Sequence, residues 1–376
     1  MGISMKMQDQ DLQPNVISLS AATSVCAKGS QWEQALRFVA EMHEQTLKPD
    51  ALSYNSAVSA CQKAELWERA LGMLLEMREQ GSEADVISFN SAALACEHGQ
   101  QWERALRLLT EMQEPALQPN VNSYSAVISA CEKSGRWKLP LLLLEEKREH
   151  NFNVISYSSA ISACEKSLHW QWASGLLAAM PQQVVEPDVI SYSAAISACE
   201  KGAEWERALG MLMYMQAQAL EPNVISYNAA ISACEKGNQW DKALGLLAMM
   251  QEQALQPTVL SYNAAISACG NGEEWELALK LLGEMRRQDF EPNAVSYNTA
   301  ITACEKGEQR EKVGVWQQAL ALLREMEQNG LDLNIIACNA AISACEKGEV
   351  WQQALALLRE LERHDLEADV ITYSAA

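Results

Sequence analysis

The sequence predicts an all-α protein, an α-solenoid superhelix of tandem antiparallel helix pairs. One segment, which begins at Val224, recurs about every 35 residues along the chain. Near copies of it begin at Val16, Ala51, Val86, Val121, Val154, Val189, Val259, Ala294 and Ile335. Within the copies, apolar residues follow the spacing of two helices, and turn residues separate them. Because neither helix can bury its apolar stripe alone, neighbouring copies must stack and share one core.

The copy that begins at Val224 shows both helices. Its first apolar stripe has the i, i+3, i+4, i+7 spacing of one helix face and consists of Tyr227, Ala230, Ile231 and Cys234. Gly237 and Asn238 predict the end of this first helix. The same spacing then recurs in Trp240, Ala243, Leu244, Leu247 and Met250. It predicts a second helix, ended by Gln256-Pro257.

The repeats divide the chain into three parts. Residues 1–15 are interpreted as the tail of a partial repeat, residues 16–369 as ten tandem repeats, and residues 370–376 as the start of a further partial repeat. No targeting peptide is visible at the start, because there is neither an apolar signal core nor an Arg/Ser-rich segment. Both ends lie inside repeats, so we expect a fragment that lacks a targeting segment or a terminal domain.

Two copies depart from the common length. The copy at Val121 is two residues short and carries Pro140, which is tolerated in the first turn of a helix. The copy at Ala294 is six residues longer than the common length, with an insertion at Arg310–Val315 between its helices. We expect both copies to disturb the superhelix locally and the register of any ligand that follows the repeats.

Composition limits the classes of function. The chain is 48% hydrophobic and has no apolar run of the ~18 residues that a membrane span needs. It is therefore expected to be neither disordered nor embedded in a membrane. The net charge of -20 argues against a surface coated with basic residues for nucleic acid, and it favours solubility or basic partners.

Cysteine and tryptophan recur at fixed positions. Ten of the eleven cysteines share one place in the first helix, Cys338 being the exception: Cys26, Cys61, Cys96, Cys131, Cys164, Cys199, Cys234, Cys269, Cys304 and Cys345. The chain contains no C-x-x-C motif, and equivalent cysteines lie a helix layer apart, so we interpret them as buried free thiols and expect no metal. A tryptophan opens every second helix, from Trp32 to Trp351. We interpret this row as packing rather than base stacking, with a cost of roughly 3 to 5 kcal/mol for replacement by alanine.

The opposite face of the first helix is unusual for a solvated surface. At 100° per residue, Ile225, Asn228, Ser232 and Lys236 point the same way. The first of these positions is aliphatic in all copies except that of Asn122: Ile17, Leu52, Ile87, Ile155, Ile190, Ile225, Leu260, Val295 and Ile336. Exposed aliphatic residues that recur in this way are candidate contacts.

The last position of this face is basic in most copies. It holds Lys28, Lys63, Lys133, Lys166, Lys201, Lys236, Lys306 and Lys347, interrupted by His98 and Asn271. The acidic residues cluster largely in the second helix, so a locally positive edge is compatible with a negative whole. Alternatively, each lysine merely complements the dipole at the end of its helix. The residues alone do not separate these two interpretations.

The unit PNVISYNAAISACEKGNQWDKALGLLAMMQEQALQP resembles the pentatricopeptide repeat. The shared features are a Val-x-Tyr-Asn opening, a Lys-x-Gly-like turn, an Ala-Leu pair with a downstream Met, and a closing Pro-Asp or Pro-Asn. The resemblance covers essentially the whole chain and indicates a P-type array of 35-residue repeats. It implies a right-handed superhelix that binds single-stranded RNA in a chloroplast or mitochondrion, one base per repeat, with N-terminal repeats at the RNA 5′ side. The related tetratricopeptide pattern is not followed.

The resemblance also implies a role for each row of residues. The aliphatic row would clamp bases, and the lysines would meet phosphates. Base edges would be read by the residue at the place of Asn228, namely Ser20, Asn55, Asn90, Ser125, Ser158, Ser193, Asn228, Asn263, Asn298 and Asn339. The closing residue of the unit would read with it: Asp50, Asp85, Asn120, Asn153, Asp188, Asn223, Thr258, Asn293, Asn334 and Asp369. The closing residue could instead serve only as a helix N-cap.

In the family, Asn with Asp favours U, Asn with Asn favours C or U, Ser with Asp favours G, and Ser with Asn favours A. The chain is therefore expected to prefer RNA resembling 5′-GUYAGANYYU-3′, where Y is C or U and N is unassigned. The implied processes are RNA processing, stability, splicing or translation.

No enzyme is expected. The chain has no H-x-E with paired Cys, no phosphate-cradling Gly loop and no nucleophile elbow, and its five histidines are scattered. We therefore expect no catalytic residues, no cofactor, no metal, no small-molecule substrate and no membrane partner. The alternative to RNA binding is a TPR-like scaffold that binds proteins, which the negative charge favours.

Overall fold

The computed structural model describes residues 15–113, 117–146, 152–307, 314–363 and 372. Within these ranges the secondary structure is helical, with twenty α-helices and one 3-10 helix. The chain forms two compact units, Met1–Pro187 and Asp188–Ala376. The expected tail at residues 1–15 lies outside the described residues except for Asn15. The expected final partial repeat at 370–376 also lies outside them, except for Thr372.

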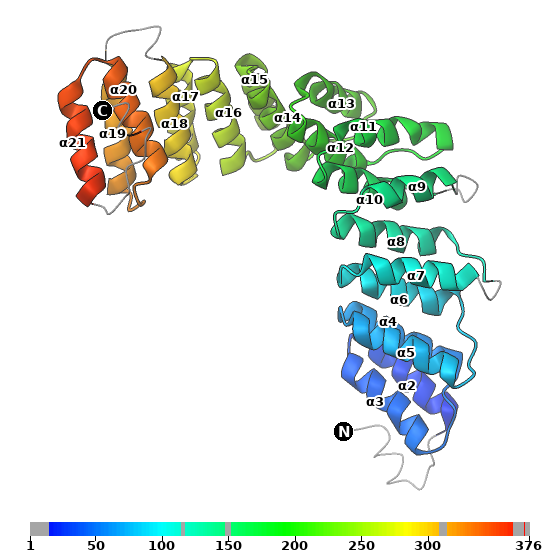
Figure 1. The fold of residues 1–376 in the computed structure, drawn as a ribbon. Helices are drawn as coiled ribbons and strands as arrows, with labels where there is room; N and C mark the ends of the chain where they lie inside the picture. Colours follow the sequence, from blue (N-terminus) through cyan, green and yellow to red (C-terminus); the bar gives the residue numbers. More distant parts are fainter. Residues whose placement is uncertain (1–14, 114–116, 147–151, 308–313, 364–371, 373–376) are drawn as a thin grey trace. The chain divides into compact units, whose positions relative to one another are not determined.

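The first unit contains five helix pairs and the 3-10 helix (Figure 1). Its helices are α2 (Val16–Lys28), α3 (Trp32–Glu44), α4 (Ala51–Lys63), α5 (Trp67–Glu79), α6 (Val86–His98), α7 (Trp102–Gln113), α8 (Val121–Lys133), α9 (Lys138–Glu146), α10 (Val154–Lys166), α11 (Trp170–Ala179) and η2 (Pro181–Gln183).

The second unit contains five further pairs. Its helices are α12 (Val189–Lys201), α13 (Trp205–Ala217), α14 (Val224–Lys236), α15 (Trp240–Glu252), α16 (Val259–Asn271), α17 (Trp275–Arg287), α18 (Ala294–Gly307), α19 (Val315–Gln328), α20 (Ile335–Lys347) and α21 (Trp351–Arg363).

In both units the even-numbered helices are the first helices of the repeats, and the odd-numbered helices are the second. Within a unit each first helix packs on its own second helix and on the first helix of the next repeat. Most second helices also contact the next first helix. This is the all-α arrangement of stacked helix pairs that the sequence predicts, and it places all first helices of a unit in one continuous row.

The core of each repeat is the predicted stripe of the first helix. In α14, Tyr227, Ala230, Ile231 and Cys234 are completely buried. A buried methionine of the second helix, such as Met250 in α15, belongs to the same core. The predicted stripe is therefore confirmed in this repeat, and its equivalents in both units are buried except for the half-buried Cys26.

The cysteines are free thiols inside this core. Cys26 is half-buried and the other ten are buried. Burial raises the pKa of eight of the ten buried thiols above the ordinary value of about 9, for example to about 11 for Cys234 and to about 12 for Cys269. Among the described residues, no group of three or more His, Cys, Asp or Glu could hold a metal ion. None of the described helices is long and apolar enough to cross a membrane.

Of the two helix ends predicted for this repeat, that of α14 is confirmed and that of α15 is wrong. Helix α14 ends at Lys236, with Asn238 at a φ of 55°, as Gly237 and Asn238 predict. The predicted end of the second helix at Gln256-Pro257 is wrong, because α15 already ends at Glu252. Ala254 has a φ of 56°, and the Leu255 N–H donates to the Met250 carbonyl at 3.1 Å. The left-handed turn therefore stops the helix before the proline.

The tryptophans are packing residues, but they are only half-buried along most of the row. Trp67, Trp205, Trp240 and Trp275 each lie over the glycine at the turn that ends the next first helix. A Cβ atom on Gly99 would lie 2.1 Å from Trp67 Cδ1, and one on Gly237 would lie 2.2 Å from Trp205 Cδ1. The indole therefore stacks one repeat on the next. Since part of each ring stays in solvent, the expected cost of removal falls below the value for a fully buried side chain.

The two irregular repeats differ in how much of them the structure describes. In the short one, Pro140 is the third residue of α9, in the first turn, where a missing N–H is tolerated. In the long one, residues 308–313 of the expected insertion lie outside the described residues. Helix α19 begins directly after Gly314, whose φ is 97°.

Candidate nucleic-acid interface

A row of aliphatic side chains is exposed along the first helices. Ile225 is the second residue of α14 and is 62% exposed, although it stands only two residues before the buried Tyr227. The exposed fractions of the nine predicted base-clamping residues lie between 53% for Val295 and 77% for Ile17. Asn122, the polar exception, is exposed as well. Packing of the repeats does not account for this row, because the side chains remain in solvent.

The two predicted reading residues of a repeat meet in space. The residue at the place of Asn228 lies at the fifth position of one first helix, and the closing residue is the N-cap of the next first helix. Asn55 Nδ2 donates to Asp85 Oδ1 at 3.2 Å, and Asn228 Nδ2 donates to Thr258 Oγ1 at 3.2 Å. Thus, residues 30 positions apart in sequence form one hydrogen-bonded pair beside the aliphatic row.

Six further reading pairs are also joined by a hydrogen bond between their side chains. They are Ser20–Asp50 at 3.0 Å, Asn90–Asn120 at 3.3 Å, Ser125–Asn153 at 3.4 Å, Ser193–Asn223 at 3.5 Å, Asn263–Asn293 at 3.5 Å and Asn298–Asn334 at 3.2 Å. The closing residue also acts as an N-cap, for example Asp188, whose Oδ1 accepts from the Ser191 N–H at 2.8 Å. Asp369 lies outside the described residues; its expected partner Asn339 accepts from Thr372 Oγ1 at 2.6 Å.

Serine and asparagine differ in depth at the reading position. Ser125 is 8% exposed, and its Oγ donates to the Val121 carbonyl of its own helix at 2.7 Å. Ser20, Ser158 and Ser193 are buried and bond to their own helices in the same way. Most of the asparagines are half-buried instead. A serine therefore leaves more space at this position than an asparagine.

A third polar residue completes most pairs, and the sequence analysis missed it. It is the hydroxyl of the third residue in the next first helix. Ser88 Oγ donates to Asn55 Oδ1, and Ser261 Oγ donates to Asn228 Oδ1. The available signal was the serine at the third position of the opening, as in Val-Ile-Ser-Tyr, which recurs in nine of the ten copies. Only stacking of the repeats shows that this hydroxyl reaches back to the preceding repeat.

Two carboxylates among the closing residues, Asp50 and Asp85, are held in the charged form. Burial acts to raise the pKa of Asp50 and Asp85, but hydrogen bonds outweigh it. Those bonds come from Ser53 and Ser20 to Asp50, and from Ser88 and Asn55 to Asp85. The pKa of both groups therefore lies below its ordinary value, so both present acceptor oxygens near neutral pH.

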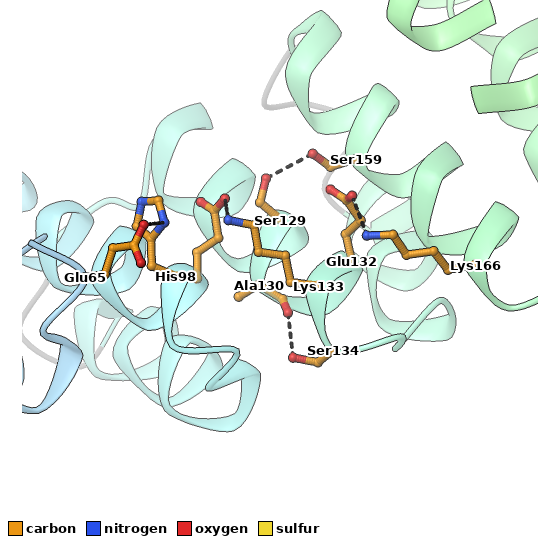
Figure 2. A network of polar contacts seen from close by, with 10 residues as sticks. Glu65, His98, Ser129, Ala130, Glu132, Lys133, Ser134, Ser159 and Lys166 are labelled. Carbon is orange, nitrogen blue, oxygen red and sulfur yellow. Dashed lines mark hydrogen bonds and ion pairs between the residues drawn. The ribbon is translucent and has the colours of Figure 1, made fainter. Parts of the chain in front are cut away.

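The predicted basic row is paired with glutamates. Lys133 Nζ lies 3.0 Å from Glu97 Oε1, and Lys166 Nζ lies 3.0 Å from Glu132 Oε1. Figure 2 shows part of this Lys–Glu ladder in the first unit. His98, which replaces a lysine, lies 3.9 Å from Glu65. These three basic residues each contact an acid of the preceding repeat, so this part of the row is not a free positive edge.

Other members of the row are held in comparable ways. Lys236 pairs with Glu200, Lys347 with Glu305 at 3.1 Å, Lys63 donates to the Ala27 carbonyl at 2.9 Å, and Lys306 donates to Asn271 Oδ1 at 2.7 Å. Lys28 and Lys201 are exposed. The acids were expected largely in the second helices, but Cys-Glu-Lys also recurs in the first helices. The glutamate of one first helix meets the lysine of the next.

Models of one known family of repeats match most of the chain. A model described as the pentatricopeptide repeat domain matches residues 2–64, 73–134, 143–202, 175–238, 211–272 and 321–375. The PPR repeat family model matches 257–306, and the PPR repeat model matches 52–82 and 122–152. The chain belongs to the pentatricopeptide repeat family. No curated protein matches the chain.

Solved pentatricopeptide repeat structures share the fold. The crystal structure of PPR10 from maize is 20% identical, with a TM-score of 0.60 over all of this chain and 58% of that protein. PPR10 in complex with an 18-nt psaJ RNA element is 18% identical, with a TM-score of 0.65 over 96% of this chain and 57% of that protein. The chain thus spans less than two thirds of the length of PPR10.

The eighth pentatricopeptide repeat lacks both partners of the Lys–Glu ladder. Gly270 replaces the glutamate, and a Cβ there would lie 2.9 Å from Ala303 Cβ, so α16 and α18 approach closely. Asn271 replaces the lysine, which leaves Glu235 to accept from Ser267 Oγ at 2.6 Å. Burial raises the pKa of Glu235 in spite of this bond. The row of Lys–Glu ion pairs is therefore interrupted in this repeat.

Proposed function

We propose that this pentatricopeptide repeat protein binds single-stranded RNA in a sequence-specific manner, one base per repeat. One observation carries the proposal. In repeat after repeat, an exposed aliphatic side chain stands beside a hydrogen-bonded pair of polar residues whose identity changes from repeat to repeat. An apolar surface that packing leaves exposed favours a flat apolar ligand, and variable donors and acceptors beside it favour recognition of its edge.

The geometry suits a base between neighbouring repeats. Side chains such as Ile225 and Leu260 occupy equivalent places on adjacent first helices and would cover the two faces of one base. The pair between these repeats, Asn228 and Thr258, would contact its edge. The complex of PPR10 with an 18-nt psaJ RNA element supports RNA binding in general, without specifying its mode or the RNA for this chain.

The lysines would contribute through phosphate contacts. A lysine that is paired with a glutamate must exchange this partner for a phosphate or share it, so its contribution is smaller than that of an unpaired cation. Affinity should still fall with salt, at a slope set by the number of phosphates neutralised. Because pentatricopeptide proteins act mostly in organelles, we place the function in RNA processing, stability, splicing or translation in a chloroplast or mitochondrion.

A TPR-like scaffold that binds a basic protein is the second candidate. The net charge of -20 and the pairing of the basic row with glutamates favour it. Such a scaffold would have no affinity for RNA beyond non-specific binding, and it would retain a basic partner at low salt.

The proposal is tested by recoding one repeat. At fixed salt, the chain should bind 5′-GUCAGAACCU-3′ more tightly than a scrambled decamer. Ser125→Asn converts the Ser–Asn pair of the fourth repeat into the Asn–Asn pair found elsewhere. It should shift the preferred fourth base from A to C or U, with a change in relative affinity of roughly tenfold.

Two outcomes contradict the proposal. Equal binding of the decamer and its scramble would exclude sequence-specific recognition. An unchanged preference at the fourth base in Ser125→Asn, together with an unchanged melting temperature, would exclude reading by this pair. Capture of a basic protein in the absence of RNA affinity would support the scaffold instead.

A further inference from the structure

We propose that the third residue of each first helix is a positioning residue that sets the hydrogen-bonding polarity of the Asn–Asn reading pair before it. The geometry of these contacts is independent of the proposed function, whereas their consequence for RNA binding rests on it. Two pairs of identical composition differ in this residue. Asn263–Asn293 is followed by Ser296, and Asn298–Asn334 is followed by Ala337.

With the hydroxyl present, the closing asparagine offers its oxygen to every neighbour. Asn293 Oδ1 accepts from the Ser296 N–H at 3.0 Å, from Ser296 Oγ at 3.1 Å and from Asn263 Nδ2 at 3.5 Å. Asn263 is only 7% exposed, and its Oδ1 is buried without a hydrogen-bond partner among the described residues. The reading asparagine therefore holds an unsatisfied acceptor.

Without the hydroxyl, the direction of the bond between the two asparagines is reversed. Asn334 Oδ1 still caps its helix by accepting from the Ala337 N–H at 2.9 Å. Its Nδ2 now donates to Asn298 Oδ1 at 3.2 Å. The acceptor of the reading residue is thus satisfied, and its Nδ2 is the group left to meet a ligand.

A third pair, in the other unit, repeats the first arrangement. Asn90 Nδ2 donates to Asn120 Oδ1, which also accepts from Ser123 Oγ at 3.1 Å. Asn90 Oδ1 is likewise buried and without a partner in the described part of the chain. The unsatisfied acceptor thus occurs in both Asn–Asn pairs that are followed by serine, and not in the pair followed by alanine.

The closing residue decides where the serine hydroxyl points. Opposite Asp85 or Thr258, the hydroxyl reaches the reading asparagine, as Ser88 and Ser261 do, and it also lies 2.8 Å from Asp85 Oδ1 or 3.1 Å from Thr258 Oγ1. Opposite a closing asparagine, it bonds to that residue and leaves the reading oxygen alone. Serine therefore satisfies the reading acceptor in one class of pair and leaves it open in the other.

The two directions of the Asn–Asn hydrogen bond predict different ligand preferences. The two repeats concerned carry the same Asn–Asn reading pair, so the pair alone would predict the same base for both. A buried acceptor without a donor is costly, so the Asn263 pair favours a base that brings a donor, such as the exocyclic amine of cytosine. The Asn263 carboxamide can turn toward it because only the 3.5 Å bond to Asn293 holds its nitrogen. The Asn298 pair offers a donor instead and favours an acceptor, such as cytosine N3 or O2.

The experiment removes one donor from the RNA. In 5′-GUCAGAACCU-3′, the cytosine at base 8 or base 9 is replaced by pyrimidin-2-one, which lacks the amine and keeps both acceptors. We expect affinity to fall roughly three- to tenfold at base 8 and to change little at base 9. Ser296→Ala should abolish the loss at base 8, and Ala337→Ser should create one at base 9. Equal losses at both bases, or variants without effect, would overturn the proposal.

A measurement without RNA separates this proposal from the proposed function. In NMR spectra of the side-chain amides, Asn334 Nδ2 protons should exchange slowly in the native protein and faster in Ala337→Ser. Asn293 Nδ2 protons should become protected in Ser296→Ala. Unchanged protection in both variants would contradict the positioning role even if RNA binds. The expected changes without any RNA preference would retain the role and reject the proposed function.

Discussion

The two faces of each first helix place the same kinds of residue in opposite environments. In α14, Ile231 is completely buried, whereas Ile225 is 62% exposed. On the buried face, Tyr227 and Cys234 recur nearly unchanged between repeats and have a complete explanation in packing. On the exposed face, Asn228 varies and the aliphatic residue has no packing partner that covers it. The difference separates residues that hold the repeats together from residues that remain available to a ligand.

The first prediction has the largest expected effect and concerns the thiols of the buried face. The pKa of eight of them is raised by burial to about 11 or 12 in the folded chain, whereas thiols of the unfolded chain ionise near pH 9. Their stabilisation is therefore fully present below about pH 9 and is lost as the pH rises through 9 toward 11. Thermal melts followed by circular dichroism should show a falling midpoint over this interval.

Cys199→Ala provides the control for this prediction, because it removes one titrating group of the same row. The decline of the midpoint with pH should become shallower in this variant. A midpoint that stays constant between pH 8 and pH 10.5 would contradict the assignment of the cysteines to a core that excludes their charged form.

The second prediction sets the two isoleucines of α14 against each other. Ile231→Ala should lower the free energy of unfolding by about 2 to 5 kcal/mol, because it leaves a cavity in the core. Ile225→Ala should change it by less than about 0.5 kcal/mol, because the side chain is exposed. Urea titrations measure both values. If Ile225→Ala lowered stability as much as Ile231→Ala, the separation into two faces would be incorrect.

The third prediction compares two glycines of neighbouring segments. Gly237→Ala should cost about 1 to 3 kcal/mol, because the new Cβ would lie 2.2 Å from Trp205 Cδ1 of the preceding repeat. Gly245→Ala, in the middle of α15, should stabilise the protein by up to about 1 kcal/mol, since no atom lies within 4 Å of its Cβ and alanine favours helix. Thermal melts of the two variants distinguish them, and equal shifts would exclude tight Trp–Gly stacking between repeats.

Much of the architecture could be predicted because it depends on local patterns. The first helices begin at Val224 and its equivalents, directly after an Asp, Asn or Thr that caps them, and the apolar period of α14 identifies its core stripe. The end of α15 could not be predicted in this way. It depends on a left-handed residue, Ala254, whose type does not favour that conformation.

The candidate interface could be predicted by residue but not by contact. Exposure of Ile225 and the proximity of Asn228 to the next closing residue follow from the helical period and the repeat. The partners of Lys133 and Lys166, by contrast, are glutamates more than thirty residues earlier. Which lysine and glutamate meet depends on the offset between neighbouring repeats, and no local pattern specifies this offset.

The amino-acid sequence by itself determined the repeat, the helix pairs, the buried stripe and the identity of the residues on the exposed face, because these follow from periodicity within about 35 residues. Only the tertiary structure decided how the repeats are joined. Stacking brings Trp205 onto Gly237 and Lys236 onto Glu200. It also brings the hydroxyl or methyl group of the third residue beside the preceding reading pair. The physical reason is that hydrogen bonds and packing act over a few ångströms, between residues that the chain places a full repeat apart.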